Sequence, residues 1–218
     1  MQTGPDMVKS LYRTYFPHTG DTEHLRNMWY LLQLIFADSH QNFYHCVRVS
    51  NYAMLISGCM DISEKDRSLL WSAAVIHDIG KIYTSKRILK KPGPLTVQEF
   101  EEIKRHPCSG SGMIERISGN SALSRTVLCH HERYDGKGYP SRLKGEKIPF
   151  LSRIISVADA YDAMTVDRVY KKKLSVEQAL EELLEERDKQ FDGRIVDAFV
   201  YAIENDGREV RRLNVSLE

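Results

Sequence analysis

Residues 130–140 of the 218-residue chain read His-His-Glu-Arg-Tyr-Asp-Gly-Lys-Gly-Tyr-Pro. They end a helical stretch at about 120–131 and begin the longest irregular segment, 132–148. Upstream, residues 77–81 read His-Asp-Ile-Gly-Lys. Imidazoles and carboxylates bind divalent transition metals, and a loop of this length in a compact domain is usually functional or disordered. The two stretches indicate a metal site at the ends of helices, beside a glycine loop.

The rest of the chain has helical periodicity nearly throughout, and the alternation typical of strands is almost absent. We therefore predict an all-α fold. Thr96 with Glu99, and Ser175 with Gln178, have the spacing of capping boxes and predict helix starts. The predicted helices cover residues 21–36, 39–58, 63–78, 96–105, 108–117, 120–131, 149–164, 175–188 and 193–204.

The length suits a single hydrophobic core. Residues 1–20 contain two prolines and two glycines with little periodicity, which predicts a loose leading segment. The helix at 21–36 has an apolar stripe that suits a linker or a homodimer contact. We therefore divide the chain into an N-terminal segment and helix, 1–36, and a main domain, 37–218.

Composition limits the partners. With 31 basic and 30 acidic side chains, the net charge of +1 gives no field that would hold a nucleic-acid polymer, whereas a small anion remains compatible. No apolar run is long enough to cross a bilayer and no secretion signal precedes the helices, so we expect a cytoplasmic protein without membrane contact. The four cysteines form no Cys-x-x-Cys pair, which favours reduced thiols over disulfides.

Polar residues join the apolar helix faces at three places. His45 lies in line with core positions of the second helix, and His77 and Asp78 end the third. Asp159 and Asp162 join the stripe of the helix near residue 150. Burying an unpaired carboxylate is costly, so acids at such positions indicate a bound cation.

The number of potential ligands indicates more than one ion. Five histidines occupy inward-facing, helix-terminal or pre-loop positions: His45, His77, His106, His130 and His131. Together with the carboxylates of Asp78 and Asp159 they give seven potential ligands. One divalent ion binds about four to six ligands, so this set suits two ions that share a bridging carboxylate. Imidazole and carboxylate ligands without thiolate suit iron, manganese, nickel or zinc better than calcium or magnesium, and they do not choose among the four. We predict iron or manganese first and nickel or zinc next.

This set of residues resembles a known family. His45, His77-Asp78 and Asp159 resemble the HD superfamily of metal-dependent phosphohydrolases. The stretches 130–140 and 153–164 are similar to the HD-GYP family, and the likeness continues to about residue 205. The resemblance implies an HD-type helical bundle with the metal site in its core and a Gly-Tyr-Pro loop at its rim. Known members are cyclic di-GMP phosphodiesterases with two or three metal ions.

The resemblance implies a ligand set. One ion is surrounded by His45, His77, Asp78 and Asp159, and Asp78 bridges to a second ion held by His106, His130 and His131. Three-metal members have a glutamate four residues before the first ligand histidine. Here that residue is Gln41, a poor ligand for a third cation, so we predict two metals.

The resemblance also implies cyclic di-GMP as the substrate. We infer that a hydroxide bridging the two ions cleaves it to linear pGpG, and further cleavage of pGpG to GMP is left open by the sequence. Asp78 and Lys81 are the predicted catalytic residues, and Lys81 brings its ammonium group to a phosphate oxygen or the leaving alkoxide. The predicted substrate-binding residues are Asp162, Arg168, Lys171, Gly138 and Tyr139. Without the resemblance, Arg168 and Lys171 would be a solvated basic face.

Other functions remain open at this stage. In some family members the Gly-Tyr-Pro loop contacts diguanylate cyclase domains, so a docking role is one alternative. The chain could also be a catalytically weak sensor of cyclic dinucleotides, or an HD hydrolase of another nucleotide. The additional histidines and the loop argue against the last reading. Residues 1–36 are too few for the sensory domain that commonly precedes this domain, so we expect a free-standing chain or a part of a longer one.

Overall fold

The structure is a computed structural model that describes residues 4–16, 23–167 and 173–205. Regular structure in these ranges is helical, with one isolated bridge between Arg187 and Phe191, which confirms the all-α prediction. The elements are α1 (Gly4–Tyr15), α2 (Glu23–Asp38), α3 (His40–Gly58), α4 (Glu64–Ile76), η1 (Ile79–Tyr83), α5 (Lys86–Leu89), α6 (Val97–Ile103), α7 (His106–Ser118), α8 (Ser121–Leu128), η2 (Gly145–Lys147), α9 (Phe150–Thr165), α10 (Val176–Glu185) and α11 (Gly193–Asn205). None of these described helices is both long and apolar enough to cross a bilayer.

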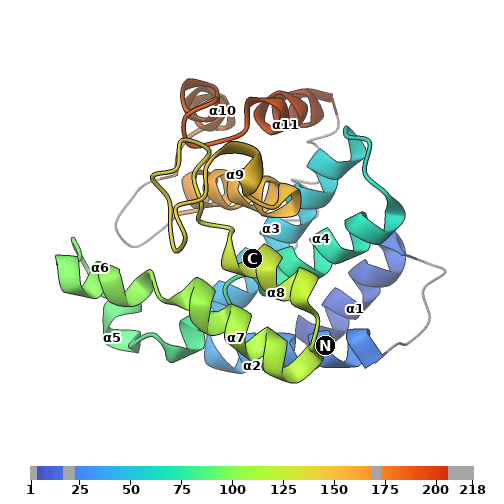
Figure 1. Cartoon of the computed structure of the whole chain (residues 1–218), viewed down its shortest axis with the longest axis vertical. Coiled ribbons are helices and arrows are strands. Elements are labelled where there is room, and N and C mark those ends of the chain that lie inside the picture. Colours follow the sequence, from blue (N-terminus) through green and yellow to red (C-terminus); the bar gives the residue numbers. More distant parts are fainter. Residues whose placement is uncertain (1–3, 17–22, 168–172, 206–218) are drawn as a thin grey trace.

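Helix α3 lies in the middle of the bundle and contacts α2, α4, α9 and α11 (Figure 1). Most of its residues are buried on every side, as are most of those of α9. A helix that neighbours cover all round must bury whatever polar groups it carries. His45 on α3 and Asp159 and Asp162 on α9 are therefore held within or beside the core.

The predicted loose leading segment is wrong for residues 4–15, which form α1. Tyr12 and Phe16 are buried one turn apart, and the Tyr12 ring centroid lies 5.9 Å from that of Trp29 and 4.9 Å from that of Trp71. Aromatic side chains at this spacing share one face, which docks α1 on the core despite the proline and glycine nearby. A linker or dimerisation role for the N-terminal segment and helix stays a prediction.

Both predicted capping boxes are present, at Thr96 and Ser175. The short elements η1 and α5 were not predicted. Gly80 of η1 packs directly on α7, because a Cβ there would lie 1.9 Å from the carbonyl oxygen of His106. This close backbone approach brings the end of α4 against the start of α7.

The loop 132–148, yellow in Figure 1, is tied to the turn between α10 and α11. The Tyr134 amide donates to the Gln190 carbonyl at 2.9 Å, and the Asp135 amide donates to the Lys189 carbonyl at 2.8 Å. The segment is thus irregular but anchored to the bundle by backbone hydrogen bonds.

Candidate metal centre

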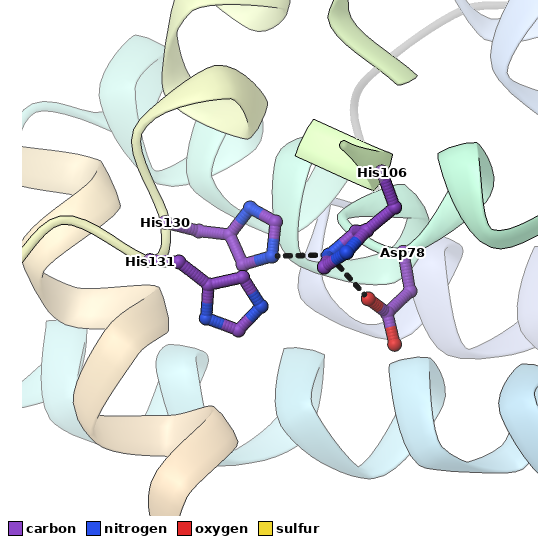
Figure 2. A group of neighbouring side chains, drawn as sticks. All are labelled: Asp78, His106, His130 and His131. Carbon is purple, nitrogen blue, oxygen red and sulfur yellow. Dashed lines mark hydrogen bonds and ion pairs between the residues drawn. The ribbon is translucent and has the colours of Figure 1, made fainter. Parts of the chain in front are cut away.

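The ends of several helices converge on one cluster of histidines and acids. His77 follows α4, His106 begins α7, and His130 and His131 follow α8. Figure 2 shows Asp78 beside His106, His130 and His131. Two groups of potential ligand atoms result, each within 4.8 Å: His45 with His77 and Asp78, and Asp78 with His106, His130 and His131. Because both groups contain Asp78, this carboxylate lies between the two halves of the cluster.

Distances within the cluster are short. Asp78 Oδ1 lies 3.1 Å from His106 Nε2, and Asp78 Oδ2 lies 3.6 Å from His45 Nε2. Asp159 Oδ1 lies 3.1 Å from the same His45 nitrogen. The structure therefore brings together every residue that the sequence analysis proposed as a metal ligand.

Backbone carbonyls fix the tautomers of three imidazoles. The Nδ1 atoms of His77, His106 and His130 lie 2.8, 2.7 and 2.5 Å from carbonyl oxygens three residues earlier. A carbonyl oxygen only accepts, so each Nδ1 carries the proton and donates it. Each Nε2 then presents its lone pair to the cluster, as metal-bound histidines do.

This arrangement leaves acceptor atoms without donors. His106 Nε2 and His130 Nε2 lie 3.2 Å apart, although neither has a proton to donate to the other. Among the described residues, His77 Nε2 and Asp78 Oδ1 are buried without a hydrogen-bond partner. Facing lone pairs and a buried carboxylate oxygen repel one another unless a cation lies between them. The donor set therefore fits divalent metal.

Electrostatics favour the metal-binding forms of Asp78 and of three imidazoles, those of His77, His130 and His131. Burial lowers the pKa of His77 and His130, and it lowers that of His131 to about 3. Burial works against the charge of Asp78, but Lys81 and the nearby imidazoles more than offset it and hold the pKa of this carboxyl well below its usual range. Neutral imidazoles and an ionised carboxylate are the forms that bind metal.

His45 is held by a buried network. Its Nδ1 lies 2.6 Å from Asp162 Oδ2, and Arg48 Nε donates to Asp162 Oδ1 at 2.7 Å. Burial opposes a charged imidazole, but hydrogen bonds to Asp159 and Asp162 outweigh it and raise the pKa of His45 to about 9. Asp162 therefore orients His45. Its predicted substrate-binding role is untested, and sequence reasoning missed Arg48, whose signal was its place one turn after His45.

A family model described as an HD domain matches residues 30–195. The chain belongs to this HD domain family. Among curated relatives, the cyclic di-GMP phosphodiesterase response regulator RpfG of Xanthomonas campestris is 42% identical over 157 residues, which are 70% of this chain and 41% of that protein. A Thermotoga maritima protein named cyclic di-GMP phosphodiesterase is 39% identical over 160 residues, which are 72% of this chain and 43% of that protein. The 3'3'-cGAMP-specific phosphodiesterase 3 of Vibrio cholerae is 38% identical over 136 residues, which are 62% of this chain and 30% of that protein.

The chain thus spans less than half the length of these relatives. Among solved structures, an HDGYP protein of Bdellovibrio bacteriovorus, Bd1817, aligns with a TM-score of 0.65 at 15% identity and covers 93% of this chain and 69% of that one. Its likeness shows the fold. Together these matches confirm the HD-GYP resemblance and the HD-type helical bundle.

The remaining predicted residues of this HD domain lie as follows. Lys81 Nζ donates to Asp78 Oδ2 at 2.5 Å, next to the cluster. The ring centroid of Tyr139 lies 4.9 Å from that of His131. A Cβ at Gly138 would lie 2.3 Å from the amide nitrogen of residue 133, so only glycine fits there. Arg168 and Lys171 lie outside the described residues.

Two further features of the HD domain concern Glu132 and the cysteines. The buried carboxylate of Glu132 accepts hydrogen bonds from the backbone amides of Ser141 and Leu143, at 2.6 and 3.0 Å. It therefore holds the Gly-Tyr-Pro loop. All four cysteines lie in the described part of the chain, and none of them forms a disulfide there.

Proposed function

We propose that this HD domain hydrolyses cyclic di-GMP, opening it to linear pGpG and cleaving that to GMP. The observation that carries the proposal is the pair of unprotonated nitrogens of His106 and His130, 3.2 Å apart beside a buried carboxylate. Such a cluster suits Lewis-acid chemistry on an anionic substrate. The names of the relatives, cyclic di-GMP and 3'3'-cGAMP phosphodiesterases, support cyclic dinucleotides as the substrate class.

Two divalent ions in this cluster would polarise a phosphodiester and activate water. The chain's own residues have separate tasks. Asp78 would be shared by both ions, and Asp162 holds the imidazole of His45 toward them. Lys81 donates to Asp78 and carries a positive charge at the edge of the cluster, where a phosphate oxygen or leaving alkoxide would develop negative charge.

A count of two ions is part of the proposal. Gln41 is an exposed residue in the first turn of α3, four residues before His45. A neutral amide there adds no charge to balance a third ion. Iron and manganese are the first choices and nickel and zinc the next, and all four accept mixed imidazole and carboxylate ligands.

The test is cyclic di-GMP turnover by anaerobically purified protein with ferrous iron or manganese, together with a metal count. His77→Ala removes a buried ligand, whereas His40→Ala makes the same change at an exposed histidine. We expect turnover and two ions per chain in the wild type and the His40 variant, and neither in the His77 variant. Full metal without turnover would instead favour a sensor or docking module.

Four further experiments test the substrate preference, the docking alternative, the homodimer and the location. Competition between cyclic di-GMP, 3'3'-cGAMP and mononucleotides separates the proposed substrate from the mixed dinucleotide and from other HD substrates. Pull-down with a diguanylate cyclase domain tests the Gly-Tyr-Pro loop as a docking surface. Sedimentation tests whether residues 21–36 support a homodimer, and fractionation of the producing cells tests the cytoplasmic location.

A further inference from the structure

A cavity of about 860 Å³ lies between the α6–α7 connection and the loop 132–148. His131 and Tyr139 line it, and His131 also belongs to the histidine cluster. In Figure 1 the yellow loop extends toward α6 and α7, which agrees with the lining of the cavity. The cavity therefore adjoins the candidate metal centre.

The lining is strongly basic. Glu101 is its one carboxylate among the described residues, whereas its cationic side chains are Lys104, Arg105, Arg133, Lys137 and Arg142. This local excess is not apparent in the net charge of +1 for the whole chain. A concave, cationic wall favours an anionic ligand.

Three of these cations already have acidic neighbours. Lys104 pairs with Glu101 at 2.6 Å. Arg133 pairs with Asp135 at 2.9 Å, and Lys137 lies 3.9 Å from the same acid. No carboxylate of the described residues lies within ion-pair distance of Arg105 or Arg142, and both are exposed. These two guanidinium groups are the ones free to bind a ligand.

The backbone around Arg142 is fixed in an unusual conformation. Its φ is 54°, in the left-handed region that a non-glycine residue seldom adopts. The amides on either side, of Ser141 and Leu143, both donate to Glu132. Because Glu132 directly follows His131, one buried carboxylate ties the position of Arg142 to that of a candidate metal ligand.

We infer that this cavity binds the terminal phosphate of a linear dinucleotide, with Arg105 and Arg142 as donors. The inference rests on the proposed function. Adding water across one phosphodiester of the ring leaves a sugar hydroxyl and a phosphate monoester, which carries about −1.5 to −2 charge. A second cleavage needs the remaining diester at the cluster, so the new monoester must lie beside it. Guanidinium groups match phosphate oxygens with paired donors.

The test is direct binding to metal-loaded protein of two ligands whose internal diester is replaced by a methylene phosphonate that resists cleavage. One is the pGpG analogue and the other the GpG analogue, which lacks the terminal phosphate. We expect the wild type to bind the first at least about tenfold more tightly. In an Arg105→Ala, Arg142→Ala double variant the two affinities should become equal.

The matched control is Arg87→Ala, Arg116→Ala, which removes the same charge at exposed positions that do not line the cavity. It should keep the preference of the wild type. An unchanged preference in the Arg105, Arg142 variant, or none in the wild type, would overturn the inference. So would inorganic phosphate binding as tightly as the pGpG analogue, since free phosphate would then be the ligand. Because no turnover is measured, failure of the proposed function would appear separately, in the cyclic di-GMP assay.

Discussion

Replacing Asp162 with asparagine distinguishes its two roles. In the structure its carboxylate accepts from Arg48 and contacts His45 Nδ1 at 2.6 Å, and the side chain is fully buried. Asp162→Asn keeps the shape and removes the charge. If the residue orients His45, metal affinity falls; if it only binds a guanine amine, KM rises and metal affinity stays.

The size of the expected loss of metal affinity follows from the contact between the Asp162 carboxylate and His45, a candidate metal ligand. Loss of such an orienting partner weakens metal binding by about 10-fold to 100-fold. That range corresponds to about 1.4 to 2.8 kcal/mol. We expect a loss in the upper part of this range, because the hydrogen bond between Asp162 and His45 is short and buried and Arg48 also fixes the carboxylate.

The assay is a manganese titration under competition from a chelator, followed by the KM for cyclic di-GMP at saturating metal. Asp61→Asn, the same change at an exposed acid with no role in the cluster, is the control. Wild-type manganese affinity in Asp162→Asn together with a raised KM would refute the orienting role and restore the substrate-binding role.

Three other predictions concern the metal, the loop and the C-terminal helices. A chelator should lower the melting temperature of the wild type and leave that of His77→Ala unchanged, because the acids and lone pairs of the cluster repel one another without cations; equal shifts would contradict this. Gly138→Ala should cost about 1 to 3 kcal/mol by urea unfolding because its Cβ meets fixed backbone, whereas Gly112→Ala, with its nearest contact at 3.6 Å, should not destabilise. Burial opposes the charge of Asp192, but Arg194 and Arg153 outweigh this effect and hold the pKa of the carboxyl below its usual range. The ionised carboxylate therefore stabilises the fold above about pH 4, and this stabilisation is lost as the pH falls through the lowered pKa of the folded state. Asp192→Asn should therefore cost about 3 kcal/mol at pH 7 and progressively less in acid, and a deficit independent of pH would refute this.

Periodicity and polar interruptions were enough to predict most helices and the residues of the cluster. His45, Asp78 and Asp159 were noticeable because they interrupt apolar faces, and interruption is a signal that sequence carries directly. Residues 4–15 were mispredicted because the helix depends on Tyr12 packing against Trp71, a contact between distant segments. Tertiary contacts of this kind override weak local preference.

Three arginines near the cluster and the cavity were not predicted as functional residues, for other reasons. A charged residue in a helix is normally assigned to the solvent face, so Arg48 was passed over even though its neighbours are buried. Arg142 lies in a loop, where no periodicity indicates direction, and Arg105 was placed at the end of the predicted helix 96–105, whereas α6 ends at Ile103. Both line one cavity because Glu132 holds the loop 132–148 in place, which only the structure shows.

The positions of the histidines at helix ends have a physical reason. The last carbonyls of a helix lack an amide four residues on, so they are available to side chains. His77, His106 and His130 each use the carbonyl three residues earlier, in α4, α6 and α8. Each carbonyl thereby keeps the proton on Nδ1, which donates to it, and leaves Nε2 facing the cluster. The C-terminal ends of α4 and α8 also carry the partial negative charge of the helix dipole, which favours a cation. Three converging helix ends thus supply orientation and tautomer together, and a histidine moved one residue along any of these helices would lose both.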